Sequence, residues 1–244
     1  MKYTTVLPLE VSFGDFKAYF NAVAIQADGG LVLVDAGLPG FLQNIQDTMA
    51  KAGLKLADVK KIIITHHDGD HIGSLKAILA KYPNIEVMAS AKQAPYITGK
   101  EKPLRLQIAE KKLTACDSEE EKEALQEDMQ RLRNIETIDK VTIVRDGDML
   151  AGGIIEIIEA SGHMPGHLCV YVPADKALIT GDALTSRDGK LCPPDTGYTL
   201  DMPTAITSLE KLLNYDIENV ICYHGGLVEG NIKESLQEII KNSK

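Results

Sequence analysis

The sequence concentrates imidazole and carboxylate groups in one short stretch, residues 65–73 (THHDGDHIG). Ionisable side chains packed this closely cannot form an apolar core, because each would need a polar partner after losing its water. Imidazole together with carboxylate is the ligand combination of zinc-type and iron-type centres. We therefore interpret residues 65–73 as part of a metal site and not as a polar turn that only caps the next helix.

Three later clusters carry the same residue types, at 161–167 (SGHMPGH), 180–182 (TGD) and 223–226 (YHGG). The chain has 6 histidines, and all of them lie in these clusters or in residues 65–73. Histidines placed for general surface or core reasons would be scattered along the chain. This distribution indicates that the clusters form a single site.

Each cluster directly follows a short apolar run rich in β-branched residues, which is typical of a strand. Polar residues just past strand ends can gather into one site. Short turns at 28–30 and 173–176 predict two hairpins. Helical periods at 41–52, 206–213 and 232–240 lie between the strands, so we predict an α/β sandwich and not a doubly wound parallel sheet. The expected strands are 20–25, 31–34, 62–64, 85–88, 141–144, 154–158, 168–172, 177–179 and 220–222.

Residues 91–140 contain no convincing strand and differ from the rest of the chain. Ser118 with Glu121 forms a capping-box pattern at the start of a charged helical stretch, and Asn231 with Glu234 forms another before the last helix. We predict that residues 91–140 are a helical insertion that lies over the main domain as a lid on the active site. The alternative is a solvated helical pair without a functional role.

The four clusters, in this order and over nearly the whole chain, resemble the metallo-β-lactamase-fold hydrolase superfamily. The family pattern is H-x-H-x-D-H, then a histidine in G-H-x-P-G-H, an aspartate after glycine, and a late histidine. The resemblance implies one domain over residues 1–244, with a four-layer αβ/βα sandwich and two divalent metal ions at one sheet edge. It assigns the metal ligands to His66, Asp68, Asp70, His71, His163, Asp182 and His224.

Position 68 departs from the family pattern, because it is Asp where most members have His. The resemblance makes Zn²⁺ the first expectation for the metal. If Asp68 binds, however, the extra carboxylate favours Mn²⁺ or Fe²⁺ over Zn²⁺. Alternatively, the shorter side chain leaves the first site weak or water-mediated. The implied ligand sets are His66, Asp68, His163 and Asp182 for one ion, and Asp70, His71, Asp182 and His224 for the other.

Four further residues near the motifs receive other roles. Asp35 resembles the family's early aspartate, which lies outside the metal ligands. We expect His67 to point away from the metals and His167 to fix a turn or hydrogen-bond a neighbouring group. Tyr198 either donates to an oxyanion or packs within its loop.

Two cations about 3.5–4 Å apart would hold a bridging water with a pKa near 7, and the resulting hydroxide would attack a carbonyl or phosphoryl centre. Asp70 is the expected catalytic residue, which orients this water and passes its proton to the leaving group. We predict a hydrolase of a small acyl substrate, namely a thioester, an ester or a lactone. A phosphodiesterase, a redox di-iron centre and a metal-binding protein without turnover remain as alternatives.

Particular family members fit the sequence less well. Thr185 stands where acyl-homoserine-lactone lactonases usually place a tyrosine. Residues 225–244 are short for the helical glutathione-binding domain of glyoxalase II. The insertion and the loop at 185–198 are expected to wall the pocket and set the choice of substrate.

Composition and charge argue against several partner classes. The net charge is -9 and no basic stripe is evident, which disfavours nucleic acid. No apolar run approaches the roughly 20 residues that span a bilayer, and residues 1–20 do not resemble a secretory signal. The 4 cysteines form no C-x-x-C pair, so we expect reduced thiols in a cytoplasmic protein. A small-molecule substrate is the expected partner, and the oligomeric state stays open, with a homodimer as one alternative.

Overall fold

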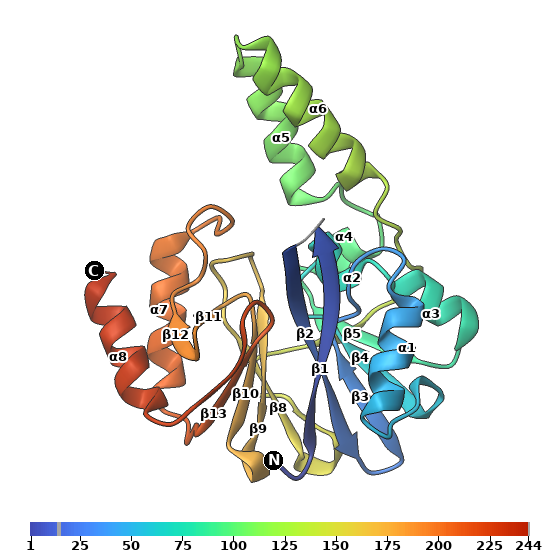
Figure 1. Cartoon of the computed structure of the whole chain (residues 1–244), viewed down its shortest axis with the longest axis vertical. Coiled ribbons are helices and arrows are strands. Elements are labelled where there is room, and N and C mark those ends of the chain that lie inside the picture. The colour runs from blue at the N-terminus through green and yellow to red at the C-terminus, as the bar shows by residue number, and fades with distance from the viewer. Residues whose placement is uncertain (14–15, 244) are drawn as a thin grey trace.

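The chain forms four layers, in the order helices, sheet, sheet, helices, and an apolar cluster fills each space between neighbouring layers (Figure 1). The computed structural model describes residues 1–13 and 16–243. Between the two sheets lies a cluster that includes Val23 and Ile63 from one sheet and Ile157 and Val170 from the other. Two further clusters join the outer face of each sheet to its own helices. The predicted four-layer αβ/βα sandwich is therefore confirmed.

The first sheet has the strand order β1-β2-β3-β4-β5-β6. Its first three strands are antiparallel, and β3 to β6 are parallel. Side chains alternate between the faces of a strand. In β2, Val23 and Ile25 therefore face the other sheet while Ala22 and Ala24 face the helices. The strands are β1 (Thr4–Phe13), β2 (Phe16–Ala27), β3 (Gly30–Val34), β4 (Val59–Ile63), β5 (Glu86–Ser90) and β6 (Thr142–Val144).

The second sheet has the strand order β14-β13-β10-β9-β8-β7, and a separate ribbon pairs β11 with β12. Its β10 and β13 are parallel, which brings their carboxyl ends to the same edge. Its other neighbouring strands are antiparallel. The strands are β7 (Met149–Leu150), β8 (Ile155–Glu159), β9 (Leu168–Val172), β10 (Ala177–Gly181), β11 (Thr185–Arg187), β12 (Lys190–Cys192), β13 (Asn219–Cys222) and β14 (Gly226–Glu229).

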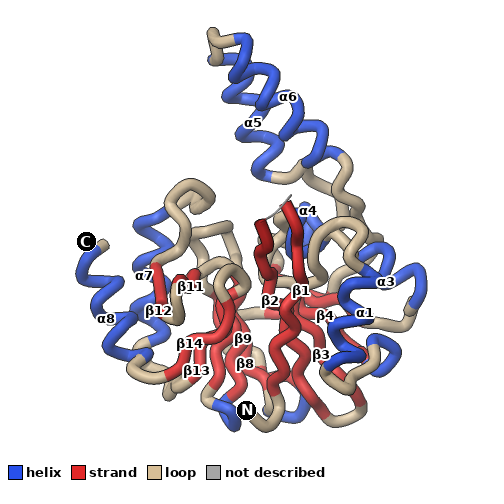
Figure 2. The backbone as a smooth tube through the Cα atoms, viewed as in Figure 1, coloured by secondary structure: helices blue, strands red, loops and turns tan. Residues whose placement is uncertain are grey.

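Helices cover both outer faces of the sandwich (Figure 2). Ile45 of α1 and Ile78 of α3 pack on the first sheet, and Leu209 of α7 and Leu236 of α8 pack on the second. The helices are α1 (Leu42–Lys51), α2 (Gly69–Ile72), α3 (Leu75–Lys81), α4 (Ala94–Ile97), α5 (Leu104–Ala115), α6 (Glu119–Arg133), α7 (Met202–Leu212) and α8 (Ile232–Asn242). Short 3₁₀ helices lie at Leu56–Asp58, Ala151–Gly153 and Pro173–Asp175.

Both predicted hairpins are confirmed, as β2–β3 and β9–β10. The first strand, β1, was not predicted from the sequence, which placed the earliest strand at residue 20. In β1, Leu7, Leu9 and Val11 are buried and alternate with more polar or exposed positions. That period of two was the available signal, but it is weaker than the continuous apolar runs of the fully buried strands.

The two capping-box predictions have different outcomes. Ser118 accepts a hydrogen bond from the backbone N–H of Glu121 at 3.4 Å, as predicted. The prediction for Asn231 was wrong, because its side chain makes no capping hydrogen bond to α8. Instead the N–H of Ile232 donates to the carbonyl of Gly230 at 2.7 Å, so the backbone turn satisfies that donor.

The insertion contains no strand among its described residues, and its helices α5 and α6 form a hairpin that projects away from the sandwich (Figure 1). The hairpin has a small apolar cluster of its own, around Leu106, Ala109 and Met129. The ends of the insertion belong instead to the main core, where Ile97 and Ile138 are buried. The segment is thus part core and part protrusion.

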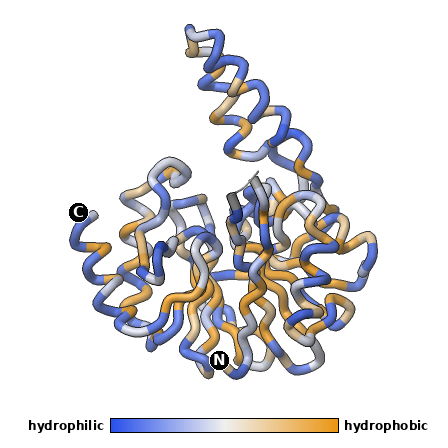
Figure 3. The backbone as a smooth tube through the Cα atoms, in the orientation of Figure 1, coloured by the Kyte–Doolittle hydropathy of each residue, from blue (hydrophilic) through white to orange (hydrophobic). Residues whose placement is uncertain are grey.

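Hydropathy follows this division. The strands of the sandwich are largely hydrophobic, whereas the projecting hairpin is mostly hydrophilic (Figure 3). Within residues 1–13 and 16–243, no helix combines the length and apolar character needed to cross a membrane.

Candidate metal centre

Four segments that are far apart in sequence meet at one edge of the two sheets. Residues 65–72 follow β4, His163 follows β8, Asp182 follows β10 and His224 follows β13. The parallel pairing of β10 with β13 places Asp182 and His224 at the same edge. An isolated bridge between Phe20 and His224 then joins the edges of the two sheets. The sequence prediction that these clusters form one site agrees with their placement.

The first predicted ligand set is assembled around Asp68 and Asp182. The Oδ2 atom of Asp68 lies 3.3 Å from Nε2 of His66 and 3.5 Å from Nε2 of His163. The Oδ2 atom of Asp182 lies 3.5 Å from the same His163 nitrogen and 3.9 Å from that of His66. His66, Asp68 and His163 can each offer one donor atom to a common ion.

The second predicted set shares Asp182 with the first. Its Oδ1 atom lies 3.4 Å from Nε2 of His71, and its Oδ2 atom lies 3.4 Å from Nε2 of His224. The Oδ2 atom of Asp70 lies 3.3 Å from the His224 nitrogen and 3.7 Å from the His71 nitrogen. The four histidines therefore surround the carboxylate of Asp182, and Asp68 and Asp70 contact the same ring nitrogens.

Buried donor atoms without partners show that this set fits a metal. Nε2 of His66, Nε2 of His71 and Oδ1 of Asp182 are buried and have no hydrogen-bond partner among the described residues. A buried polar atom left unpaired costs about 1–3 kcal/mol, so a native site needs a reason for several together. Neutral imidazole nitrogens and carboxylate oxygens are good donors for Zn²⁺, Mn²⁺ and Fe²⁺.

Asp35 holds one ligand in place from behind. Its Oδ2 atom accepts a hydrogen bond from Nδ1 of His71 at 2.8 Å, which leaves Nε2 of that ring facing the site. Its Oδ1 atom accepts from the backbone N–H of Thr65 at 2.9 Å. This contact fixes the tautomer and the orientation of His71. Asp35 thus takes the place, outside the ligands, that the resemblance implied.

His167 positions the shared aspartate and is not part of a candidate ligand group. Its Nε2 atom accepts a hydrogen bond from the backbone N–H of Asp182 at 3.1 Å. Burial lowers the pKa of His167 to about 3, so the ring is neutral and can accept this bond. Gly181 before Asp182 has φ +49°, and a Cβ there would lie 2.8 Å from the His167 nitrogen. Only glycine fits between the ring and the turn.

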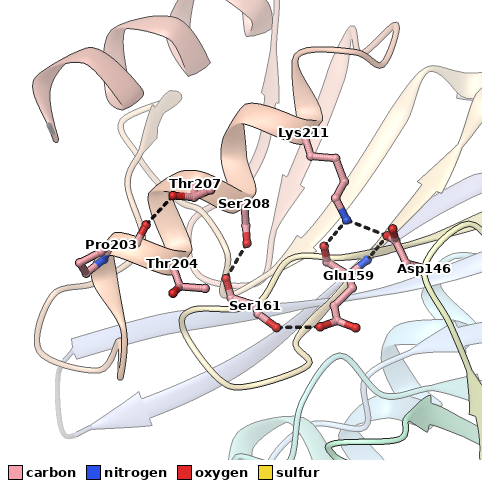
Figure 4. Close-up of a pocket in the computed structure, with 8 residues that line it drawn as sticks. All are labelled: Asp146, Glu159, Ser161, Pro203, Thr204, Thr207, Ser208 and Lys211. Carbon is pink, nitrogen blue, oxygen red and sulfur yellow. Dashed lines mark hydrogen bonds and ion pairs between the residues drawn. The ribbon is translucent and has the colours of Figure 1, made fainter.

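A polar network supports the segment that carries His163 (Figure 4). Ser208 of α7 donates to the carbonyl of Ser161 at 2.7 Å, and Ser161 donates to the carboxylate of Glu159 at 2.9 Å. Lys211 donates to the Glu159 carbonyl at 2.8 Å and pairs with Asp146. These residues also line a surface hollow, and none of the predicted metal ligands lines it.

Electrostatics in the second set favour protonated histidines while no cation is bound. Burial alone would lower the pKa of His71, but the carboxylates of Asp35, Asp182 and Asp70 raise it well above its usual range. Asp182 and Asp70 likewise outweigh burial and raise the pKa of His224 to about 10. His71 and His224 in turn hold the pKa of Asp182 well below its usual range despite burial. A bound cation must displace protons from these rings.

His67 points away from the ligands, as predicted, and connects the motif to the insertion. Its Nδ1 atom donates to the side-chain oxygen of Gln93 at 2.6 Å, and its Nε2 atom accepts from the backbone N–H of Leu104 at 3.2 Å. Its ring stacks on Tyr96 with 4.3 Å between centroids. The first turn of α5 is therefore attached directly to the metal-binding motif.

Arg105 is a site residue that the sequence-based prediction missed. Its Nη2 and Nε atoms lie 2.6 and 2.7 Å from Oδ2 of Asp68, and Nη2 lies 3.2 Å from Nε2 of His163. Together with His163 and His66, this guanidinium holds the pKa of Asp68 well below its usual range, although burial opposes the shift. The one sequence signal was the unbalanced carboxylate at position 68, which does not say where its partner lies.

Tyr198 lies beside Arg105 at the rim of the site. Its carbonyl accepts from Nη2 of Arg105 at 2.9 Å, and its ring centroid lies 5.5 Å from the guanidinium carbon. The Tyr198 residue is 63% exposed, so its ring is not packed within the loop. The position leaves its hydroxyl open to solvent and to a substrate.

A two-sheet sandwich with histidines and aspartates converging at one sheet edge defines a class of metal-dependent hydrolases. The chain belongs to the metallo-beta-lactamase superfamily, whose family model matches residues 20–224. The protein named "Probable metallo-hydrolase YflN" of Bacillus subtilis (strain 168) is 28% identical over 229 residues, which cover 85% of this chain and 80% of that protein.

Two further similarities extend this result. A hydroxyacylglutathione hydrolase of Prochlorococcus marinus (strain MIT 9312) is 28% identical over 131 residues, or 52% of this chain and 37% of that protein. The crystal structure of a metallo-beta-lactamase family protein from Thermus thermophilus has a TM-score of 0.74 at 19% identity, covering 99% of this chain and 79% of the other. At this identity the structural match shows the fold alone.

Proposed function

We propose that this protein is a binuclear metal-dependent hydrolase of a small acyl substrate, namely a thioester, an ester or a lactone. The observation that carries the proposal is the set of buried, unpartnered atoms on His66, His71 and Asp182, which face a shared site. Zn²⁺ is the first expectation for the metal, with Mn²⁺ and Fe²⁺ as alternatives. Divalent ions held there would supply a water of lowered pKa and would polarise the acyl oxygen.

The protein's own residues would hold the substrate and move the proton. Asp70 is the proton acceptor we propose, because its side chain is 23% exposed while its Oδ2 atom faces His224 and His71. It can therefore reach both the ligand cluster and an incoming substrate. The short hydrogen bond from the Tyr223 hydroxyl to the Asp70 carbonyl fixes the backbone at this position. Tyr198 at the rim is placed to contact the acyl group.

Relatives and cysteine chemistry support the choice of an intracellular acyl substrate. The Prochlorococcus relative is named as a hydrolase of hydroxyacylglutathione, which is a thioester. All four cysteines of this chain are free, as is usual for proteins of a reducing compartment. We therefore include cytoplasmic location and a small-molecule partner in the proposal.

The test combines metal analysis with a panel of substrates. Protein purified without added metal would be analysed for Zn, Mn and Fe, and then assayed with p-nitrophenyl acetate, S-lactoylglutathione, γ-butyrolactone and bis-p-nitrophenyl phosphate. We expect bound divalent metal and turnover of at least one acyl substrate above the phosphodiester. Exclusive phosphodiester turnover, or no tightly bound metal, would overturn the proposal.

An isosteric substitution then tests the catalytic role of Asp70, with bound metal measured beside activity because Asp70 is also a predicted metal ligand. Asp70→Asn should lower kcat/KM by about 10²–10⁴, the range typical of a lost general acid or base. The matched control is Asp47→Asn on α1, far in sequence from the motifs, which should leave kcat/KM unchanged. Full activity of the Asp70→Asn protein would remove Asp70 from the catalytic role.

A further inference from the structure

The two ligand sets are not equally open to a metal ion, because Arg105 already occupies the donor atoms of one of them. Its Nε atom donates a hydrogen bond to Oδ2 of Asp68 at 2.7 Å, and its Nη2 atom lies 2.6 Å from the same oxygen as an ion pair. Its Nη2 atom also lies 3.2 Å from Nε2 of His163. Asp68 and His163 are two of the three residues in the candidate group completed by His66.

Lone-pair geometry makes the contact at His163 exclusive of a metal, and the contact at Asp68 opposes a metal at Oδ2. A neutral imidazole nitrogen has a single acceptor site, so Nε2 of His163 cannot accept from Arg105 and bind a cation together. A carboxylate oxygen has about two acceptor sites, and at Oδ2 of Asp68 the Nε–H of Arg105 takes one while the positive Nη2 group lies 2.6 Å away. Two cations on one oxygen also repel each other strongly at low dielectric.

The second set has no such competitor. Nε2 of His71 and Oδ1 of Asp182 are buried and have no hydrogen-bond partner among the described residues. A guanidinium is protonated at every relevant pH and can leave only by moving its side chain.

Arg105 is placed so that it can move without breaking the fold. It lies in the first turn of α5, and its side chain is 20% exposed. Its remaining partner is the Tyr198 carbonyl at the rim, at 2.9 Å. Rotation of the side chain toward that rim would free Asp68 and His163 together.

We infer that Arg105 is an internal cation that competes with metal for the His66, Asp68 and His163 set. Metal therefore binds in sequence, first at the set containing Asp70, His71, Asp182 and His224, and afterwards at the set that Arg105 must leave. Charge balance agrees with this exchange. Three carboxylates and one guanidinium, on Asp68, Asp70, Asp182 and Arg105, carry the same net charge as a site with one carboxylate fewer. This inference rests on the proposed metal binding but not on the substrate class.

The test is a metal titration of the metal-free protein. Binding of Zn²⁺ is measured by calorimetry, and binding of Co²⁺ is measured by its visible absorption. The native chain should bind one equivalent tightly and the next more weakly. Arg105→Met keeps the aliphatic stem and removes the competing donors, so its weaker site should tighten by about tenfold or more, which corresponds to about 1.4 kcal/mol. Its tighter site should change less, which distinguishes competition from a general effect of charge.

The control is Arg131→Met on α6, where the arginine is exposed and pairs with Asp128. It removes the same charge from the same insertion and should leave both binding constants unchanged. A second measurement follows the unaltered chain and needs a conservative variant only to assign one resonance. The side-chain Nε–H resonance of Arg105, assigned by its absence in Arg105→Lys, should shift with the second equivalent of Zn²⁺ and not with the first.

The outcomes separate this inference from the proposed function. Two equal sites in the native chain, an unchanged weaker site in Arg105→Met, or an Arg105 resonance that shifts with the first equivalent would overturn the competition. If the second site of Arg105→Met binds metal more weakly than that of the native chain, the arginine orients Asp68 for metal. That result would also overturn the competition. Absence of metal binding in every variant would instead refute the proposed function.

Discussion

The backbone N–H of Leu104 donates a hydrogen bond to Nε2 of His67 at 3.2 Å, across 37 positions of sequence. His67 stands between the predicted ligands His66 and Asp68, yet its ring faces the insertion. This contact ties the first turn of α5 to the metal-binding motif. It also fixes the backbone next to Arg105, the residue that reaches back to Asp68.

His67→Phe keeps a ring that can stack on Tyr96 but removes the hydrogen bonds to Leu104 and Gln93. We expect a loss of about 1–3 kcal/mol of unfolding free energy, because two side-chain hydrogen bonds of about 0.5–1.5 kcal/mol each are lost, while the Gln93 side-chain oxygen still accepts from the backbone N–H of residue 67. Hydrogen exchange should quicken in the first turn of α5 while bound metal is retained. Loss of metal in this variant would mean that His67 acts as a ligand.

The projecting hairpin is expected to be dispensable for the fold. Replacing residues 104–133 with a short Gly/Ser linker removes its own apolar cluster but leaves Ile97 and Ile138 in the main core. The shortened protein should still fold and bind metal, and KM for the natural substrate should rise while turnover of a small activated ester is spared.

Replacing all of residues 91–140 is a harsher change, since it also removes buried Gln93 and Ile97. That longer deletion should unfold the protein and serves as the contrast. If the shorter deletion also unfolds it, as judged by circular dichroism, the hairpin is part of the cooperative core.

Asp182 is expected to be needed for both ions. Its two oxygen atoms lie within 3.4–3.9 Å of ring nitrogens on His71, His224, His163 and His66. Asp182→Ala should therefore lose most of the bound metal from both sites, measured by elemental analysis after dialysis. Retention of two ions per chain with full activity would show that the shared position is wrong.

Asp68→His tests the departure from the family motif. A neutral, softer donor with one fewer negative charge should raise affinity for Zn²⁺ relative to Mn²⁺. Asp68→His also removes the carboxylate that pairs with Arg105. The substitution should therefore be tested together with Arg105→Met, so that no unpaired guanidinium remains in the site. Competition titrations with the two ions measure the effect, and unchanged selectivity in the double variant would place Asp68 outside the metal ligands.

Metal affinity should rise with pH. In the metal-free protein the pKa of His224 is raised to about 10 and that of His71 is also raised, so both rings carry protons at neutral pH. A metal needs the neutral rings, so binding must release protons and weakens as pH falls. Calorimetry in buffers of different ionisation enthalpy measures the protons released, and a buffer-independent heat would contradict the expectation.

The stability of the metal-free protein should show the opposite trend. A raised pKa means that the protonated rings stabilise the fold at pH values below about 6.5, the unfolded value of histidine. That contribution is lost as pH rises through about 10, the folded value for His224. Thermal melts of chelator-treated protein across this window should show a falling melting temperature, which bound metal abolishes.

The sequence by itself predicted the α/β sandwich, the motif positions and their meeting in one site, and its resemblance to the family implied the four layers and the ligand set. The reason is local: apolar β-branched runs such as those before His66 and Asp182 form buried strands whatever surrounds them. Polar residues just past those strands have one edge at which they can meet. The hairpin turn at 173–176 was equally predictable, because its turn chemistry is contained in a few neighbouring residues.

Only the tertiary structure decided which of these groups are free to bind metal. The orientation of His67 depends on Gln93 and Leu104, and the state of Asp68 depends on Arg105. These partners lie 26 to 37 positions away, on segments whose packing no local pattern specifies. A long, flexible arginine in a charged insertion has the same local signature whether it is solvated or inserted into a metal site. Its role is set by the distance between α5 and the sheet edge, and that distance exists only in the folded chain.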